Sequence, residues 1–210
     1  MSNVGYIDST VWLSKLRELE SYLKDFISRE LRFPRGVESL SKRVLGASEV
    51  ILTFEDKVEV VVLRGNWGMM FVKASQKGGM DLTSTGLKGF QPSFYVARVG
   101  PYGMKCSCED SVMTSSKAEK ALLTLFRRHD PEMLYKLYNT FVTAKYVICK
   151  HTLALTSLLL ALGVLDLSNE VFRKTLRNSA LTLALREGLS QISEDTFFKV
   201  NEMVREAMPY

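Results

Sequence analysis

The three cysteines of this 210-residue chain all belong to one spaced pattern, and one of its two histidines completes that pattern. Cys106-x-Cys108 is followed, after the 40 residues 109–148, by Cys149-x-His151. Thiolate sulfur and imidazole nitrogen are the ligands that a tetrahedral zinc ion prefers in proteins, and four of them complete its coordination. The sequence therefore predicts a Zn²⁺ site, which requires a fold that brings the two halves of the pattern together.

The spacing within each half of the pattern predicts its local structure. The segments Ser93–Val99 and Met104–Cys108 flank a glycine turn, which is typical of a β-hairpin. Residues i and i+2 of a strand point to the same face, so the first two cysteines would project together from the second strand. Residues i and i+2 of a helix lie roughly 200° apart. We therefore expect Cys149 just before a helix and His151 in its first turn, with Thr152–Leu162 continuing the helix.

A set of three thiolates and one imidazole leaves no open position on zinc, so the expected site is structural and not hydrolytic. The alternative is two buried cysteines, a third without a role and a histidine that caps a helix, because free cysteine often serves as a small core residue. The sequence contains no phosphate-binding glycine loop and no serine elbow. We therefore expect no enzymatic activity.

The ligand pattern resembles the SWIM zinc finger, whose signature is C-x-C-x(n)-C-x-H on a ββα frame. The resemblance covers roughly Val58–Leu162, although only the four ligand residues are specific. SWIM domains act as DNA-binding or protein-interaction modules, and some occur in small proteins that partner RecA-like recombinase paralogues during homologous recombination. The resemblance implies a non-enzymatic zinc-binding adaptor in DNA recombination or repair, in complex with a RecA-like ATPase paralogue. The alternatives are a direct DNA-binding regulator or mobile-element-associated SWIM protein, and a structural zinc fold within another complex.

Hydrophobic periodicity predicts an α+β fold, with a small antiparallel sheet between an N-terminal helix and C-terminal helices. The helical N-terminal element, residues 1–46, contains a helix over Thr10–Leu31 with one apolar stripe and a short helix over Val37–Leu45. The strands predicted before the finger are Glu49–Phe54, Val58–Arg64 and Met69–Ala74.

We expect residues 1–210 to form a single domain, since no repeat or linker interrupts the chain. Residues 49–162 would hold the sheet and the zinc finger, with a helical insert at 109–148, and residues 163–210 would form the C-terminal helices. The last of these helices has a narrow apolar stripe, which suits either a groove on a partner protein or the chain's own core. The residues of this predicted partner-binding stripe are Phe197, Val200, Val204 and Met208.

The net charge of +5 is concentrated in one segment, since Val60 to Lys105 holds six cationic side chains against Asp81 alone. Aromatic residues alternate with these cations, and a basic surface with aromatics is typical of single-stranded nucleic-acid binding. The alternative is the solvated face of a sheet whose aromatic residues form core, because alternating strands give the same pattern. The predicted nucleic-acid-binding residues are Arg64, Lys73, Lys77, Lys88, Arg98 and Lys105.

We expect an intracellular, cytoplasmic protein without membrane attachment, or a nuclear one if the source has a nucleus. The N-terminal segment MSNVGYIDST is polar and lacks the basic-then-apolar pattern of a signal peptide. The longest apolar stretch, Thr152–Leu165, is too short to span a bilayer. An odd number of cysteines placed as metal ligands favours a reducing compartment.

Overall fold

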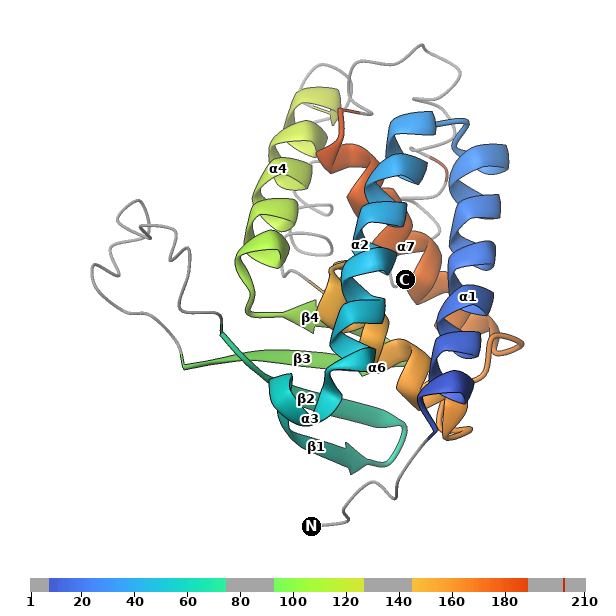
Figure 1. Cartoon of the computed structure of the whole chain (residues 1–210). Helices are drawn as coiled ribbons and strands as arrows, with labels where there is room; N and C mark the ends of the chain where they lie inside the picture. Colours follow the sequence, from blue (N-terminus) through green and yellow to red (C-terminus); the bar gives the residue numbers. More distant parts are fainter. Residues whose placement is uncertain (1–7, 75–92, 127–144, 189–201, 203–210) are drawn as a thin grey trace.

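The computed structural model describes residues 8–74, 93–126, 145–188 and Glu202, and it confirms the α+β class (Figure 1). Four antiparallel strands form a sheet in the order β1-β2-β3-β4. The strands are β1 (Val58–Arg64), β2 (Trp67–Lys73), β3 (Phe94–Gly100) and β4 (Gly103–Cys106). The helical elements are α1 (Ser9–Asp25), the π-helical turn η1 (Phe26–Glu30), α2 (Pro34–Leu52), α3 (Phe54–Lys57), α4 (Glu109–Phe126), α6 (Lys150–Ala161) and α7 (Glu170–Arg186).

Helix α6 is the centre of the core. Every side chain from His151 to Leu160 is buried, and a helix that is buried all round must be surrounded by other elements. It contacts α1 and α2 as well as strands β2, β3 and β4. At Gly68 in β2 a Cβ atom would lie 2.7 Å from the side chain of Leu159, so glycine permits this close approach of strand and helix.

The helix predicted over Thr10–Leu31 is present as α1 and η1. Asp8 caps α1, since its carboxylate accepts a hydrogen bond from the backbone N–H of Thr10 at 2.8 Å. The apolar stripe of α1 is buried, and its Trp12 reaches α6. The indole Nε1 of Trp12 donates to the carbonyl oxygen of Ala154 at 2.8 Å and to Ser157 Oγ at 2.7 Å. This side chain therefore ties the first helix of the chain to the central one.

The predicted strand Glu49–Phe54 is wrong, because these residues end α2 and begin α3. Their composition favours a strand locally. However, Val44, Ala47 and Val50 recur at three-residue spacing and are buried together on one face of α2. Burial of that face outweighs the local preference. The predicted short helix Val37–Leu45 is thus part of one long helix.

The remaining predicted strands and helices are present within the part of the chain that the structure describes, with differences at their ends. Helix α4 begins directly after Cys108, at the start of the predicted helical insert, and α7 is capped by the Asn169 side chain. No helix among residues 8–74, 93–126 and 145–188 is long and apolar enough to cross a membrane. The second half of the predicted insert, residues 127–144, lies outside the described residues, as do Phe197, Val200, Val204 and Met208.

Replacing Trp12 with alanine should lower the free energy of unfolding by about 3–5 kcal/mol, because a large buried side chain leaves a cavity. The change also removes both hydrogen bonds to α6. Chemical denaturation measures this loss. Val11→Ala is the control, since the Val11 side chain is 48% exposed, and it should cost less than about 0.5 kcal/mol. Equal losses in the two variants would show that Trp12 does not anchor α1.

Candidate metal centre

The first two cysteines of the pattern lie at the end of the β3–β4 hairpin. Cys106 ends β4, whereas Cys108 lies one residue before α4 and its carbonyl oxygen accepts from the N–H groups of Ser111 and Val112. The strand therefore ends two residues earlier than predicted, and the two cysteines do not project from one strand. Instead the chain turns back, so that the backbone N–H of Cys108 donates to Cys106 Sγ at 3.4 Å.

The second half of the pattern has the predicted local structure. Cys149 is the N-cap of α6 with an extended backbone, and His151 follows in the first turn of the helix. Cys149 Sγ accepts from the N–H of Thr152 at 3.5 Å, and Thr152 Oγ1 accepts from the N–H of Cys149 at 2.9 Å. This capping box fixes the sulfur at the positive end of the helix dipole, which favours the thiolate.

A short backbone clamp brings the two halves together. The N–H of Met104 in β4 donates to the carbonyl oxygen of Lys145 at 2.6 Å, and the N–H of Val147 donates to the carbonyl oxygen of Met104 at 3.0 Å. Tyr146 thereby forms a parallel bridge with β4. A Cβ atom at Gly103 would lie 3.0 Å from the Lys145 carbonyl oxygen, so glycine admits this segment. These hydrogen bonds place the start of α6 next to the end of the β3–β4 hairpin.

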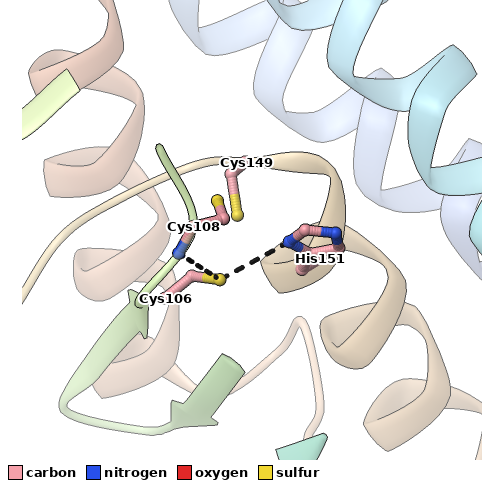
Figure 2. A group of neighbouring side chains, drawn as sticks. All are labelled: Cys106, Cys108, Cys149 and His151. Atoms are coloured by element: carbon pink, nitrogen blue, oxygen red, sulfur yellow. Dashed lines mark hydrogen bonds between the residues drawn. The ribbon is translucent and has the colours of Figure 1, made fainter. Parts of the chain in front are cut away.

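The four ligand atoms converge between β4 and α6 (Figure 2). The sulfurs of the three cysteines and the ring nitrogen of His151 all lie within 4.8 Å of one another. Cys106 Sγ and His151 Nδ1 are 3.5 Å apart. Tetrahedral zinc, with bonds of about 2.3 Å to sulfur and about 2.0 Å to nitrogen, places two such ligands about 3.5 Å apart. Cys106, Cys108, Cys149 and His151 can therefore hold a metal ion.

The closeness of the three sulfurs controls their protonation. Hydrogen bonds with Cys108 and Cys149, together with burial, raise the pKa of the Cys106 thiol. Burial opposes ionisation of Cys149 as well, but its hydrogen bonds with the other two thiols and with His151 hold the pKa of Cys149 well below its usual value. Three neighbouring thiolates repel one another, so a cation is needed for all three to ionise together. This donor set suits a divalent ion whose binding releases thiol protons.

The surroundings of His151 hold its ring in place. Tyr95 of β3 stacks on it with ring centroids 5.6 Å apart and an angle of 28° between the rings. The ring is almost fully buried, at 3% exposure. A polar cavity of about 690 Å³ adjoins the centre and is lined by Cys108, Lys150 and His151, among other residues. By stacking on the His151 ring, Tyr95 orients this candidate ligand, and neighbours that orient a ligand influence how a site binds its metal.

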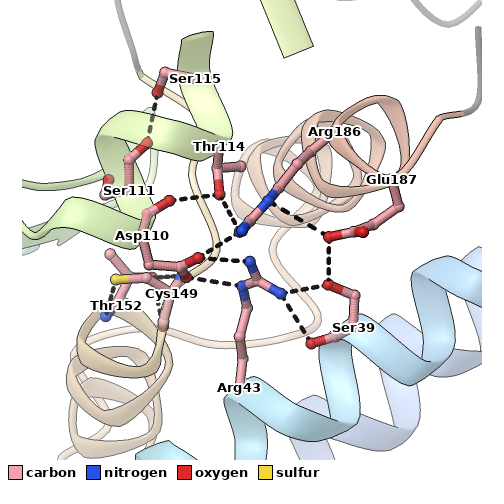
Figure 3. A network of polar contacts seen from close by, with 10 residues as sticks. All are labelled: Ser39, Arg43, Asp110, Ser111, Thr114, Ser115, Cys149, Thr152, Arg186 and Glu187. Atoms are coloured by element: carbon pink, nitrogen blue, oxygen red, sulfur yellow. Dashed lines mark hydrogen bonds and ion pairs between the residues drawn. The ribbon is translucent and has the colours of Figure 1, made fainter. Parts of the chain in front are cut away.

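A polar network beside the ligand cluster joins α2, α4 and α7 (Figure 3). The carboxylate of Asp110 accepts two hydrogen bonds from Arg43, from Nε at 3.0 Å and from Nη2 at 2.8 Å. Arg186 donates to the same carboxylate and, at 2.8 Å, to Thr114 Oγ1. Burial raises the pKa of the Asp110 carboxyl, although Arg43 opposes this shift. Because Asp110 lies two residues after Cys108, the network fixes the first turn of α4 next to that ligand.

Sequence reasoning missed this network. Arg43 and Asp110 are 67 residues apart and Arg186 and Asp110 are 76 apart, so no local spacing marks them as partners. Ser39 extends the network by donating to Glu187 at 2.8 Å.

The other predicted site residues do not join the metal centre. The structure places the four that it describes on the strands, each with an exposed side chain: Arg64, Lys73, Arg98 and Lys105. Lys77 and Lys88 lie outside the described residues, as does the predicted partner-binding stripe.

Comparison with known proteins leaves the metal centre to be interpreted from its own geometry. No protein-family model matches the sequence, and the searches of curated proteins and of solved structures find no similar protein.

Replacing Asp110 with alanine should lower the free energy of unfolding by about 1–3 kcal/mol, because two partly buried arginines lose their shared acceptor. Thermal or chemical denaturation measures the loss. Glu18→Ala is the matched control, since Glu18 pairs with Lys15 on the surface and is 50% exposed. It should cost less than about 0.5 kcal/mol. A loss no larger for Asp110 than for Glu18 would show that the network does not stabilise the fold.

Proposed function

We propose that the metal is zinc and that its role is structural. The observation that supports this most is the ligand set itself, with three cysteines and one histidine whose donor atoms lie within 4.8 Å of one another. Such a set suits tetrahedral zinc and leaves it no position for water or substrate. The zinc would be held by Cys106, Cys108, Cys149 and His151, and it would supply folding free energy, not catalysis.

The position of the centre explains what structural zinc would do here. Its ligands come from the end of the β3–β4 hairpin, from the residue before α4, and from the N-cap and first turn of α6. Zinc would therefore hold the sheet, the inserted helix and the central helix at one point. The order of β3, β4 and α6 with this ligand spacing also supports the resemblance to the SWIM finger and its ββα frame.

The function we infer from that resemblance is a non-enzymatic adaptor in DNA recombination or repair. Its partner would be a RecA-like ATPase paralogue, as for the small SWIM proteins of homologous recombination. The second candidate is a direct DNA-binding regulator or a mobile-element-associated SWIM protein. It is favoured by the exposed cations on the strands, Arg64, Lys73, Arg98 and Lys105. Strong, steeply salt-dependent binding of the purified chain to duplex DNA would favour this second candidate.

Purified protein should contain about one zinc ion per chain by elemental analysis. Cys106→Ser, Cys149→Ser and His151→Ala should each lose the metal and lower the Tm by about 10 °C or more, because metal binding contributes to folding. His129→Ala, which changes the chain's other histidine, is the control and should retain zinc. Stoichiometric zinc in the double variant Cys106→Ser/Cys149→Ser would refute the ligand assignment.

Affinity purification of the tagged protein from its native cells should recover a RecA-like ATPase, identified by mass spectrometry. If the predicted C-terminal stripe docks on this partner, Phe197→Glu/Val204→Glu should remove the ATPase and leave the zinc content unchanged. Val171→Glu is the control, since it changes an apolar side chain that is already 44% exposed on α7. Recovery of no ATPase with the unaltered protein would contradict the adaptor function.

A further inference from the structure

The register of the sheet separates two faces of different chemistry. Side chains alternate between faces along a strand. Met70 of β2 pairs with Ala97 of β3, and both are fully buried, so they belong to the inner face that α6 covers. Their sequence neighbours Met69 and Arg98, which also pair, lie on the opposite side, hereafter the outer face. The cationic residues and the exposed aromatic residues of the outer face are Arg64, Trp67, Lys73, Phe94, Arg98 and Lys105.

The outer face presents aromatic side chains to solvent. The indole of Trp67 crosses from β2 to β3, since a Cβ atom at Gly100 would lie 2.2 Å from the ring. Trp67 is nevertheless 38% exposed, and Phe94 is 36% exposed. Val60 and Val62 of β1 are 47% and 39% exposed. Strand β1 forms the edge of the sheet (Figure 1). Exposed apolar side chains gathered on one face are typical of a binding surface.

Two cations of the outer face lie directly opposite each other, an arrangement that does not stabilise the sheet. Arg98 and Lys105 are directly opposed on β3 and β4, and like charges in this relation destabilise a sheet. Arg64 adds a third exposed cation, on β1. Lys73 adds a fourth and pairs with Glu59 at 3.2 Å. An anionic ligand lying across the strands would relieve the repulsion between Arg98 and Lys105.

We propose that the outer face binds single-stranded DNA. Bases stack on Trp67 and Phe94, and phosphates lie near Arg64, Arg98 and Lys105. An unpaired strand offers base faces and phosphates together, which are what exposed rings and cations bind. Duplex DNA offers the phosphates but hides the base faces, and an apolar protein surface would leave the cations unmatched. The biological setting rests on the proposed role in DNA recombination or repair, whereas the binding test requires neither that role nor the ATPase.

The triple variant Arg64→Gln/Arg98→Gln/Lys105→Gln tests the electrostatic part. The probe is fluorescein-labelled oligo(dT) of about 20 nucleotides, longer than the roughly 4–16 nucleotides that comparable sites cover. Affinity at low salt should fall about tenfold or more, and the slope of log K against log salt should flatten by about 2, or 0.7 for each lost contact. The control variant removes the same amount of charge from α1 and α4, away from the sheet, by replacing three exposed cations: Arg17→Gln/Lys117→Gln/Lys120→Gln. It should bind oligo(dT) like the unaltered protein.

Trp67 itself reports on the stacking part, because the chain's other tryptophan, Trp12, is only 3% exposed. Oligo(dT) should quench the tryptophan emission of the unaltered protein but not that of Trp67→Phe. The phenylalanine variant keeps a ring and should retain most of the affinity. Trp67→Ala should weaken binding roughly 5- to 150-fold, the range that corresponds to the loss of one stacked base.

Equal affinity of the unaltered protein and the triple variant for oligo(dT) would overturn the proposal, as would binding that leaves the Trp67 emission unchanged. Tighter binding of oligo(U) than of oligo(dT) would exclude DNA as the preferred ligand. Loss of a co-purifying ATPase from the triple variant, with DNA affinity intact, would make the outer face a protein-docking surface. Binding of oligo(dT) through this face without any co-purifying ATPase would support the site and refute only the adaptor function.

Discussion

Two hydrogen bonds between β4 and the segment before α6 bring the two pairs of candidate metal ligands together. Met104 of β4 bonds to Lys145 and Val147, which lie near the end of the 40-residue insert between the ligand pairs. Closing a loop of that length costs conformational entropy, and an ion bound to both ends would offset part of this cost. The same contact sets the start of α6, which is the central helix of the core. The candidate metal site and the start of the central helix therefore share one junction.

Cys149 illustrates how closely the two are linked. Its sulfur accepts the hydrogen bond that caps α6 and is also one of the four converging ligand atoms. A metal bound there would act on the helix terminus directly. On the other side of the cluster, Asp110 ties the first turn of α4 to α2 and α7 through Arg43 and Arg186. The candidate ligands are therefore held in place by the start of α6 on one side and by the first turn of α4 on the other.

Strand alternation places the candidate metal ligand of β4 and the exposed cations on opposite faces of the sheet, although they are close in the sequence. Lys105 and Cys106 are neighbours in β4, yet Lys105 pairs with Arg98 on the outer face and Cys106 with Ala97 on the inner face. The candidate ligand set, of which Cys108, Cys149 and His151 are buried and Cys106 is partly buried, therefore lies on the opposite side of the sheet from Arg98 and Lys105. Any ligand of the outer face would meet charge and aromatic rings without approaching the thiolates.

The sequence by itself determined which four residues could hold a metal ion, the position of Cys149 just before a helix and most of the helices and strands, because each depends on residue type and short-range spacing. It also indicated the basic and aromatic character of the segment around β2 and β3, but not that Arg64, Lys73, Arg98 and Lys105 share one face. Pairing between strands decides that, through a register that composition does not encode.

Only the tertiary structure decided that Glu49–Phe54 is helical, since burial of the α2 face outweighs the local preference for a strand. It alone brought Arg43, Asp110 and Arg186 together, across separations of 67 and 76 residues. Contacts of this kind depend on where whole helices pack, which is set by the sum of many weak apolar contacts and not by any local pattern.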